Sequence, residues 1–140
     1  MREISPYSAR LIVLTGGEPS LSIDENLTAA LHKAGKTVAI ETNGTRPLPS
    51  GIDWVTLSPK TEFTENAEPI ITSCDELKVI YTGEPFDTYP HISASHRFLQ
   101  PCDTGYKTRN AQLTLQAAHW CIVHPQWRLS LQIHKIIGIE

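Results

Sequence analysis

The sequence predicts an α/β protein built on a mostly parallel sheet, and three observations support this fold class. Six short apolar runs recur at a spacing of roughly 20 residues, as strands do in such folds. The stretches between them are long enough for the helix or loop crossovers that parallel strands require. Polar residues gather where these runs end, and parallel sheets bind their ligands at the carboxyl ends of their strands.

The first apolar run, residues 10–15, ends in glycine and is typical of a buried strand. The next segment predicts a helix, because apolar residues recur at helical spacing over residues 23–34. Ser22, followed three residues later by Glu25, predicts a capping box at the start of this helix. Gly35 predicts a left-handed residue at its end.

Proline-rich and polar segments separate the remaining elements. Residues 60–75 are polar and contain prolines, so we expect them to be largely irregular. Residues 108–123 have the length and apolar density of a second helix, which His124 and Pro125 end. Five further strands are expected, at residues 36–41, 53–58, 76–81, 96–100 and 127–133.

Composition excludes several classes of protein. The chain has 140 residues, of which 40% are hydrophobic and 19% charged, and this suits one globular domain. A net charge of −3 and a pI near 6.0 argue against a general nucleic-acid binder. No apolar run reaches the roughly 20 residues that a membrane span needs. The N-terminus lacks the apolar core of a secretion signal, which predicts a cytoplasmic protein.

The three cysteines lie far apart in the sequence. Cys74, Cys102 and Cys121 form no short repeat, and an odd number fits neither a disulfide framework nor a zinc site. Free cysteine behaves as a small apolar residue, so we expect all three thiols to pack in the interior.

The first candidate site residues follow the first strand. Gly16 and Gly17 lack side chains, so a ligand can approach their peptide groups closely, and Glu18 could accept from an ammonium group. A pair of glycines is also typical of a plain turn. Thr15 and Pro19 on either side make the pattern more specific.

Polar residues also end the second strand. Glu41 closes an apolar strand, where an ionised carboxylate needs a partner. It could accept from ribose hydroxyls, or it could form an ion pair at the end of the sheet. Thr42, Asn43 and Gly44 could line a ligand or form an ordinary Asx-type turn.

The later strand ends carry the remaining candidates. Ser58 and Lys60 could hold a carboxylate through a hydroxyl and an ammonium group, although Ser-Pro-Lys is also typical of a surface turn. Gln100 could be a satisfied amide at the sheet end. In residues 127–133 apolar and polar residues alternate, so His134 is expected on the polar face, either packed and hydrogen-bonded or facing a ligand.

Taken together, these segments resemble a known family. LTGGEP, AIETNGT, DWVTLSPK, RFLQP and WRLSLQIHK, in this order, resemble the 7-carboxy-7-deazaguanine synthase family of radical S-adenosylmethionine enzymes. GGEP alone indicates only the superfamily, whereas ETNGT, SPK and LQIHK narrow it to this family. The resemblance covers essentially all 140 residues. It implies that residues 1–140 form one domain, an incomplete (β/α) barrel of the radical S-adenosylmethionine type with mainly parallel strands and few helices.

The resemblance also implies an activity. The family contracts the ring of a 6-carboxy-tetrahydropterin to 7-carboxy-7-deazaguanine, with release of ammonia, in queuosine and deazapurine biosynthesis. A [4Fe–4S] cluster cleaves S-adenosylmethionine to a deoxyadenosyl radical, and magnesium assists this lyase reaction. The cofactor supplies the radical chemistry, while the protein positions and shields it.

The family's site residues can be carried over to this sequence. The resemblance assigns no catalytic residue and no metal ligand. It implies that Gly16, Gly17 and Glu18 hold the methionyl amino group of S-adenosylmethionine, that Glu41, Thr42 and Asn43 line its methionyl or ribose part, that Ser58 and Lys60 contact carboxylate or ribose oxygens, and that Gln100 lies on the nucleoside side. It implies that Thr15, Gln132, His134 and Lys135 lie toward the pterin.

One motif of the family is missing from the sequence. Members carry a CxxxCxxC motif whose thiolates bind the cluster, and these 140 residues contain none. The family's first strand and cluster loop are expected to precede residue 1. We therefore expect this chain alone to be inactive in the family reaction. We also expect a homo-oligomer that covers the open edge of the barrel.

Two other functions remain open at this point. One is a fragment of a glycyl-radical-enzyme activase, since GGEP also occurs there, although LQIHK and SPK disfavour it. The other is a non-catalytic module that binds S-adenosylmethionine. Titration with S-adenosylmethionine would help to separate these from a bare fragment of a synthase.

Overall fold

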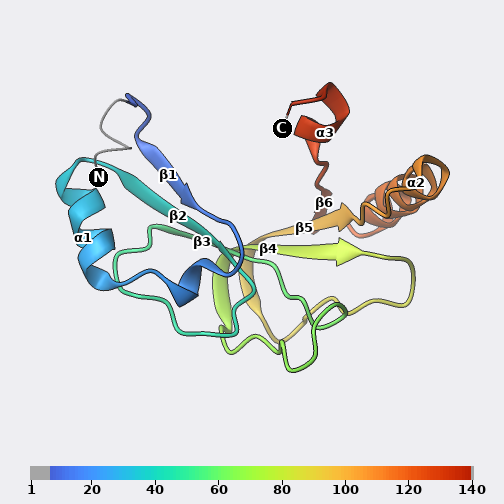
Figure 1. The fold of residues 1–140 in the computed structure, drawn as a ribbon. Helices are drawn as coiled ribbons and strands as arrows, with labels where there is room; N and C mark the ends of the chain where they lie inside the picture. Colours follow the sequence, from blue (N-terminus) through green and yellow to red (C-terminus); the bar gives the residue numbers. More distant parts are fainter. Residues whose placement is uncertain (1–6, 140) are drawn as a thin grey trace.

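Six parallel strands pair in chain order in a computed structural model that describes residues 7–139 (Figure 1). β1 and β6 form the two edges of this sheet and do not pair with each other. This topology confirms the predicted α/β fold with a parallel sheet. The strands are β1 (Leu11–Leu14), β2 (Thr37–Thr42), β3 (Trp54–Leu57), β4 (Ser73–Tyr81), β5 (Ser93–Pro101) and β6 (Trp127–Leu129).

Few helices accompany the sheet. Figure 1 shows α1 near one end of the sheet, where it packs against β2, and α2 near the other end, against β5 and β6. No helix within residues 7–139 is both long and apolar enough to cross a membrane. The helices are the 3₁₀ turn η1 (Pro19–Leu21), α1 (Glu25–Lys33), α2 (Lys107–Val123) and α3 (Ile133–Ile137).

α1 and α2 pack on one face of the sheet, and the core lies there. Leu31 of α1 packs in a fully buried environment, as do Val38 and Ile40 of β2. On β4, the residues Leu77, Val79 and Tyr81 are buried in a larger cluster that also includes Leu113 of α2. Because side chains alternate along a strand, the opposite face is free to carry polar groups. That face holds the candidate site.

The start of α1 differs from the predicted capping box. Asp24, and not Ser22, is the N-cap residue, and its Oδ1 accepts a hydrogen bond of 2.8 Å from the backbone N–H of Leu27. Ser22 instead ends η1, where its backbone N–H donates to Pro19 O. Serine and aspartate are both favoured N-cap residues, and Ser22 is already part of the turn at η1, so Asp24 caps α1. Gly35 has a φ of +71°, which confirms the predicted left-handed residue.

Replacing Asp24 by alanine is expected to lower the free energy of unfolding by about 1 kcal/mol, because the N–H of Leu27 loses its acceptor. Ser22→Ala serves as the matched control and is expected to change it by less than about 0.5 kcal/mol. Urea denaturation followed by circular dichroism measures both. Equal losses for the two variants would contradict the assignment of the cap to Asp24, and a larger loss for Ser22→Ala would return it to Ser22.

Three strand boundaries differ from the prediction by three residues or more, and the others differ by at most one residue. β4 begins at Ser73 and β5 at Ser93, so both strands are three residues longer at their start than expected. β6 ends at Leu129, and the chain then forms α3 where the sequence predicted strand to residue 133. The polar face that alternation predicted for residues 127–133 therefore ends with the strand, at Arg128. The oligomer expected to cover the sheet edge stays a prediction.

Candidate functional site

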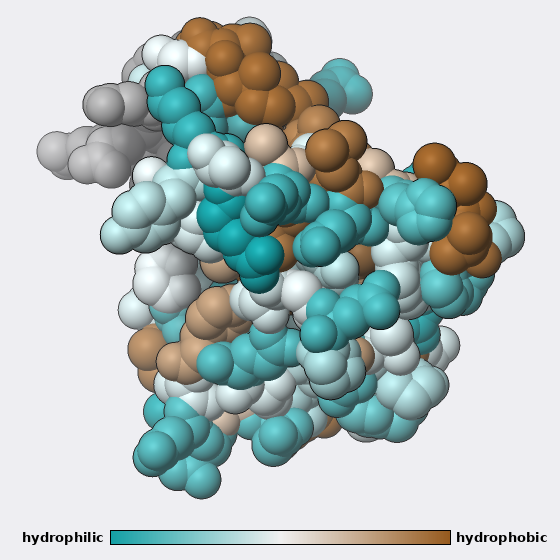
Figure 2. Space-filling view, turned by 90° about the vertical axis from the view of Figure 1, so that its right-hand side faces the viewer, coloured by the Kyte–Doolittle hydropathy of each residue, from teal (hydrophilic) through white to brown (hydrophobic). Residues whose placement is uncertain are grey.

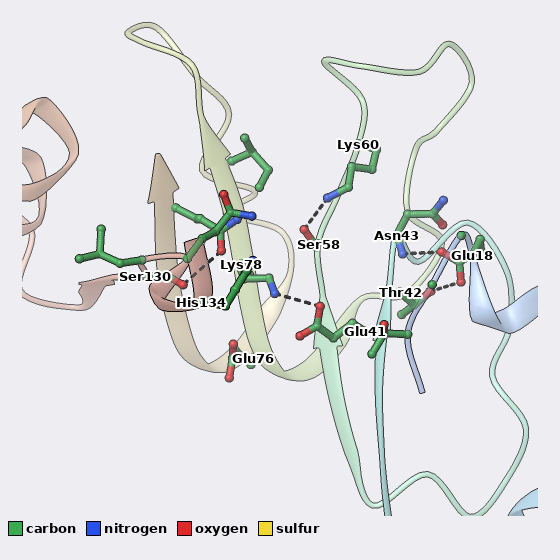
Figure 3. Close-up of a pocket in the computed structure, with 17 residues that line it drawn as sticks. Glu18, Glu41, Thr42, Asn43, Ser58, Lys60, Glu76, Lys78, Ser130 and His134 are labelled. Carbon is green, nitrogen blue, oxygen red and sulfur yellow. Dashed lines mark hydrogen bonds and ion pairs between the residues drawn. The ribbon is translucent and has the colours of Figure 1, made fainter. Parts of the chain in front are cut away.

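A pocket of about 580 Å³ (Figure 3) opens at the carboxyl ends of the strands, on the face opposite α1 and α2. Twelve of the thirteen residues assigned to ligands by the resemblance line it; the exception is Lys135. The lining residues are Thr15, Gly16, Gly17, Glu18, Glu41, Thr42, Asn43, Ser58, Lys60, Glu76, Lys78, Ile80, Gln100, Ser130, Leu131, Gln132 and His134.

Glu18 links the first two strand ends. Its Oε1 accepts from Thr42 Oγ1 at 2.6 Å and from the Ser20 N–H at 3.1 Å, and its Oε2 accepts from the Asn43 N–H at 2.7 Å. Burial alone would raise the pKa of Glu18, but these hydrogen bonds together hold it below its ordinary value. Glu18 is therefore an ionised, fixed acceptor. Among the described residues, 7–139, Oε2 accepts one hydrogen bond, so it keeps a lone pair for a ligand donor.

The backbone beside Glu18 is open to a ligand. A Cβ atom at Gly16 or Gly17 would meet no atom of a non-neighbouring residue within 4 Å in the part of the chain that the structure describes, so the space beside both Cα atoms is open. Gly16 has a φ of +110°, a conformation that other residues rarely adopt. The two glycines thus make a turn and also leave room at the pocket wall.

The residues at the end of β2 form the predicted Asx-type turn and also line the pocket. The side-chain oxygen of Asn43 accepts from the Thr45 N–H at 3.0 Å and from Thr45 Oγ1 at 2.8 Å, which is the Asx-type turn. Thr42 Oγ1 accepts from the Gly44 N–H at 3.1 Å while it donates to Glu18. The turn thereby holds the Asn43 N–H toward Glu18, and both residues still line the pocket.

Two lysines place positive charge in the pocket. Lys78 Nζ lies 3.1 Å from Glu41 Oε2, so the ion pair considered for Glu41 is present. Lys60 Nζ donates to Ser58 Oγ at 2.7 Å. Burial lowers the pKa of Lys60, and the nearby charge of Lys78 lowers it further. A ligand carboxylate would offset both effects.

The middle of β4 supplies residues that the strand-end argument missed. Glu76, Lys78 and Ile80 point into the pocket, while Leu77 and Val79 between them are buried in the core. The alternation of Glu, Lys and Ile with Leu and Val was visible in the sequence as a strand with one polar face. Burial raises the pKa of Glu76 above its ordinary value.

The C-terminal segment closes another side of the pocket. Ser130 Oγ donates to Gln100 Oε1 at 3.3 Å, and Gln132 and His134 lie on the pocket wall. Lys135 does not line this pocket. It lies at a smaller neighbouring cavity of about 190 Å³ and pairs with Asp103. Lys135 lies in α3, which follows β6 after Leu129, and its side chain lies against the loop after β5 instead of the pocket.

The cysteines take no part in the pocket. Cys74 is buried in the main core, and Cys102 and Cys121 pack against the same core. Within residues 7–139, no group of three or more histidine, cysteine, aspartate or glutamate side chains could hold a metal ion. The site therefore offers carboxylates, ammonium groups, amides and open backbone, a set suited to a polar ligand that carries both charges.

The sequence of this chain is similar to those of several known proteins. No protein-family model matches it. It is 51% identical, over 139 residues, to the 7-carboxy-7-deazaguanine synthase of Bacteroides thetaiotaomicron, covering 99% of this chain and 70% of the relative. It is 47% identical to the enzyme of that name from Bordetella pertussis, covering 93% of this chain and 60% of that one.

A solved structure agrees with these relatives. The crystal structure of QueE from Escherichia coli matches with a TM-score of 0.66 and 26% identity, over 93% of this chain and 60% of that one. The chain thus spans 60% of the length of the Bordetella and Escherichia proteins and 70% of that of the Bacteroides protein.

Proposed function

This chain belongs to the 7-carboxy-7-deazaguanine synthase family, and from that premise we propose that its pocket binds S-adenosylmethionine beside a 6-carboxy-tetrahydropterin. The whole protein would then ring-contract the pterin to 7-carboxy-7-deazaguanine. The relatives favour this family over the glycyl-radical-enzyme activases. The observation that carries the proposal is the fixed, ionised Glu18 beside the open backbone of Gly16 and Gly17.

These residues fit the amino-acid end of S-adenosylmethionine. An ammonium group can donate to the remaining lone pair of Glu18 Oε2, and the open space beside Gly16 and Gly17 lets a ligand approach the peptide groups. Lys60 and Ser58 could hold the carboxylate, which would keep the Lys60 ammonium charged. In the family reaction S-adenosylmethionine supplies the radical that abstracts hydrogen from the pterin. The chain's own residues bind and orient the two ligands and shield them from water.

The pterin would occupy the remaining side of the pocket. Thr15, Gln132 and His134 line it there, with the Glu41–Lys78 pair between the two ends. Within residues 7–139, no group of three or more histidine, cysteine, aspartate or glutamate side chains is placed to hold a metal ion, and no residue is assigned here to the family's [4Fe–4S] cluster or magnesium.

Calorimetric titration of the 140-residue chain tests the proposal. We expect S-adenosylmethionine to bind in the micromolar range. 5′-Methylthioadenosine, which lacks the amino-acid end, is expected to bind at least about ten-fold more weakly, because it forms no charge-assisted hydrogen bonds with Glu18 and Lys60.

A variant adds a second comparison. Lys60→Met is expected to weaken binding of S-adenosylmethionine and to leave that of 5′-methylthioadenosine unchanged, and Lys33→Met on the exposed face of α1 is the matched control. If the wild-type chain binds neither nucleoside, or binds both equally, the proposed site is wrong.

A further inference from the structure

The segment that carries Gln132 and His134 to the pocket is weakly attached to the sheet. We define residues 130–137 as the C-terminal arm, which follows β6 and includes α3. The Ser130 N–H donates to Leu99 O at 2.9 Å, and Ser130 Oγ donates to Gln100. Beyond Ser130, the arm's backbone hydrogen bonds within residues 7–139 stay inside the C-terminal segment.

Apolar packing does not hold α3 in place. Ile133, Ile136 and Ile137 are 62%, 68% and 61% exposed, and no residue of α3 is buried. On the side of the molecule that carries α2 and α3, Figure 2 shows separate apolar areas open to the surface. Little hydrophobic free energy therefore fixes where this short helix lies, and a polar contact can decide its position.

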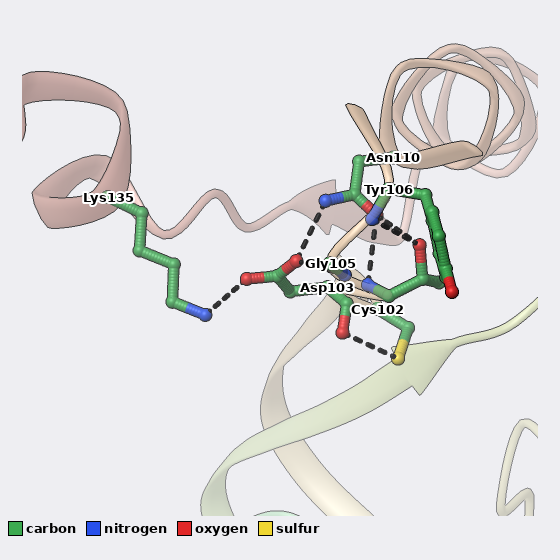
Figure 4. A network of polar contacts seen from close by, with 7 residues as sticks. Cys102, Asp103, Gly105, Tyr106, Asn110 and Lys135 are labelled. Carbon is green, nitrogen blue, oxygen red and sulfur yellow. Dashed lines mark hydrogen bonds and ion pairs between the residues drawn. The ribbon is translucent and has the colours of Figure 1, made fainter. Parts of the chain in front are cut away.

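The loop between β5 and α2 presents a fixed carboxylate to the arm (Figure 4). Asp103 Oδ1 accepts from the Gly105 N–H at 2.9 Å and from Asn110 Nδ2 at 2.7 Å. The amide oxygen of Asn110 accepts from the N–H and hydroxyl of Thr104 at 2.9 and 2.7 Å, which fixes the orientation of its amide. Asp103 is thus held by its own loop and by α2 before it contacts the arm.

The second oxygen of this carboxylate binds the arm. Asp103 Oδ2 lies 2.5 Å from the Nζ atom of Lys135, the middle residue of α3. The Lys135 ammonium, with the hydrogen bonds from Gly105 and Asn110, holds the pKa of Asp103 well below its usual range. Among the side chains of α3 within residues 7–139, Lys135 is the one that forms an ion pair.

We propose that Asp103 is a positioning residue: through its ion pair with Lys135 it holds the C-terminal arm so that Gln132 and His134 stay on the pocket wall. The identity of the ligand that these two side chains meet, the pterin, rests on the proposed function. Lys135 acts on the pocket from outside it, in contrast to the direct pterin contact that the family resemblance implied.

Two variants remove the pair without touching the pocket. Asp103→Asn and Lys135→Met are each expected to speed amide hydrogen exchange in residues 133–139, where the N–H groups of Lys135 and Ile139 donate to Gln132 O and His134 O of the arm. They are expected to weaken binding of 6-carboxy-tetrahydropterin about three- to five-fold, the range of an exposed ion pair, with binding of S-adenosylmethionine unchanged. High salt is expected to weaken pterin binding to the wild type but not to the variants.

Rescue separates this role from a general structural one. Lys135→Arg keeps the cation and is expected to restore both slow exchange and pterin affinity, and Lys33→Met controls for loss of a surface charge. Unchanged exchange in Asp103→Asn and Lys135→Met would overturn the proposal, as would equal weakening of both ligands. If the wild-type chain itself binds no pterin, the proposed function fails, and hydrogen exchange alone then decides whether Asp103 positions the arm.

Discussion

Replacing Glu18 by alanine is expected to lower the free energy of unfolding by about 2 kcal/mol, or the melting temperature by roughly 8 °C. The substitution removes the acceptor of three hydrogen bonds and leaves the hydroxyl of Thr42, a residue that is 3% exposed, and the N–H of Asn43 without their partner. It is also expected to abolish measurable binding of S-adenosylmethionine. Thermal and urea denaturation measure the first effect, and calorimetry measures the second.

The chemistry of the carboxylate sharpens this prediction. In the structure both carboxylate oxygens of Glu18 accept hydrogen bonds, whereas glutamine has one acceptor oxygen and one NH₂ group. In Glu18→Gln the NH₂ group therefore faces a donor, either the Thr42 hydroxyl or the Asn43 N–H. Glu18→Gln is therefore expected to lose part of the stability that Glu18→Ala loses. Glu65→Gln, at an exposed position outside the pocket, is the matched control and is expected to lose none.

The loss is expected to depend on pH with a definite sign. The pKa of Glu18 is lowered on folding, so its stabilising contribution is present above the unfolded value of 4.5 and is lost as the pH falls through the folded value. The stability difference between wild type and Glu18→Gln should be larger at neutral pH than at about pH 3.5. A difference that stays constant with pH would show that the ionised form of Glu18 is not what holds Asn43.

Gly44→Ala is expected to be the most destabilising change in the loop after β2, costing about 3 kcal/mol. Gly44 has a φ of +77°, and a Cβ there would lie 2.4 Å from Leu57 Cδ1 and 3.1 Å from Pro69 Cβ. Leu57 is fully buried in the main core and cannot move aside without displacing its neighbours. Because Asn43 precedes Gly44, the same displacement is expected to disturb the contact between Asn43 and Glu18.

A second glycine isolates the crowding from the backbone strain. Gly35 has a similar φ of +71°, but a Cβ there would meet nothing within 4 Å. Gly35→Ala is therefore expected to cost only the left-handed strain, about 1 kcal/mol. Urea midpoints of the two variants give the difference directly. Equal midpoints would mean that the loop opens to admit the methyl group and that Leu57 does not constrain it.

Several features of the fold could be predicted because they depend on neighbouring residues. Short apolar runs separated by crossovers indicated six parallel strands, and helical spacing indicated α1 and α2. Boundaries were less certain, since Ser22 and Asp24 are both good N-caps and only the turn at Pro19 decides which one caps α1.

The pocket could be anticipated in part for a related reason. Parallel strands bring their carboxyl ends to one edge, so residues as distant as Glu18 and Asn43 were expected to lie together. Glu76 and Lys78 were not among the predicted site residues, because candidates were sought only at strand ends. The alternation of residues along β4 nevertheless indicated one polar face. What these residues bind stays a prediction from the family.

What the sequence by itself determined, then, is the set of strands, the two longer helices and the edge of the sheet at which polar groups collect. Only the tertiary structure decided that β6 stops at Leu129 and that Lys135 turns away to meet Asp103, 32 residues earlier in the chain. The physical reason is that periodicity is a local property, set by side chains a few residues apart. The ion pair joins a loop to a short helix, and its distance depends on where the sheet places both segments, which a local sequence pattern does not contain.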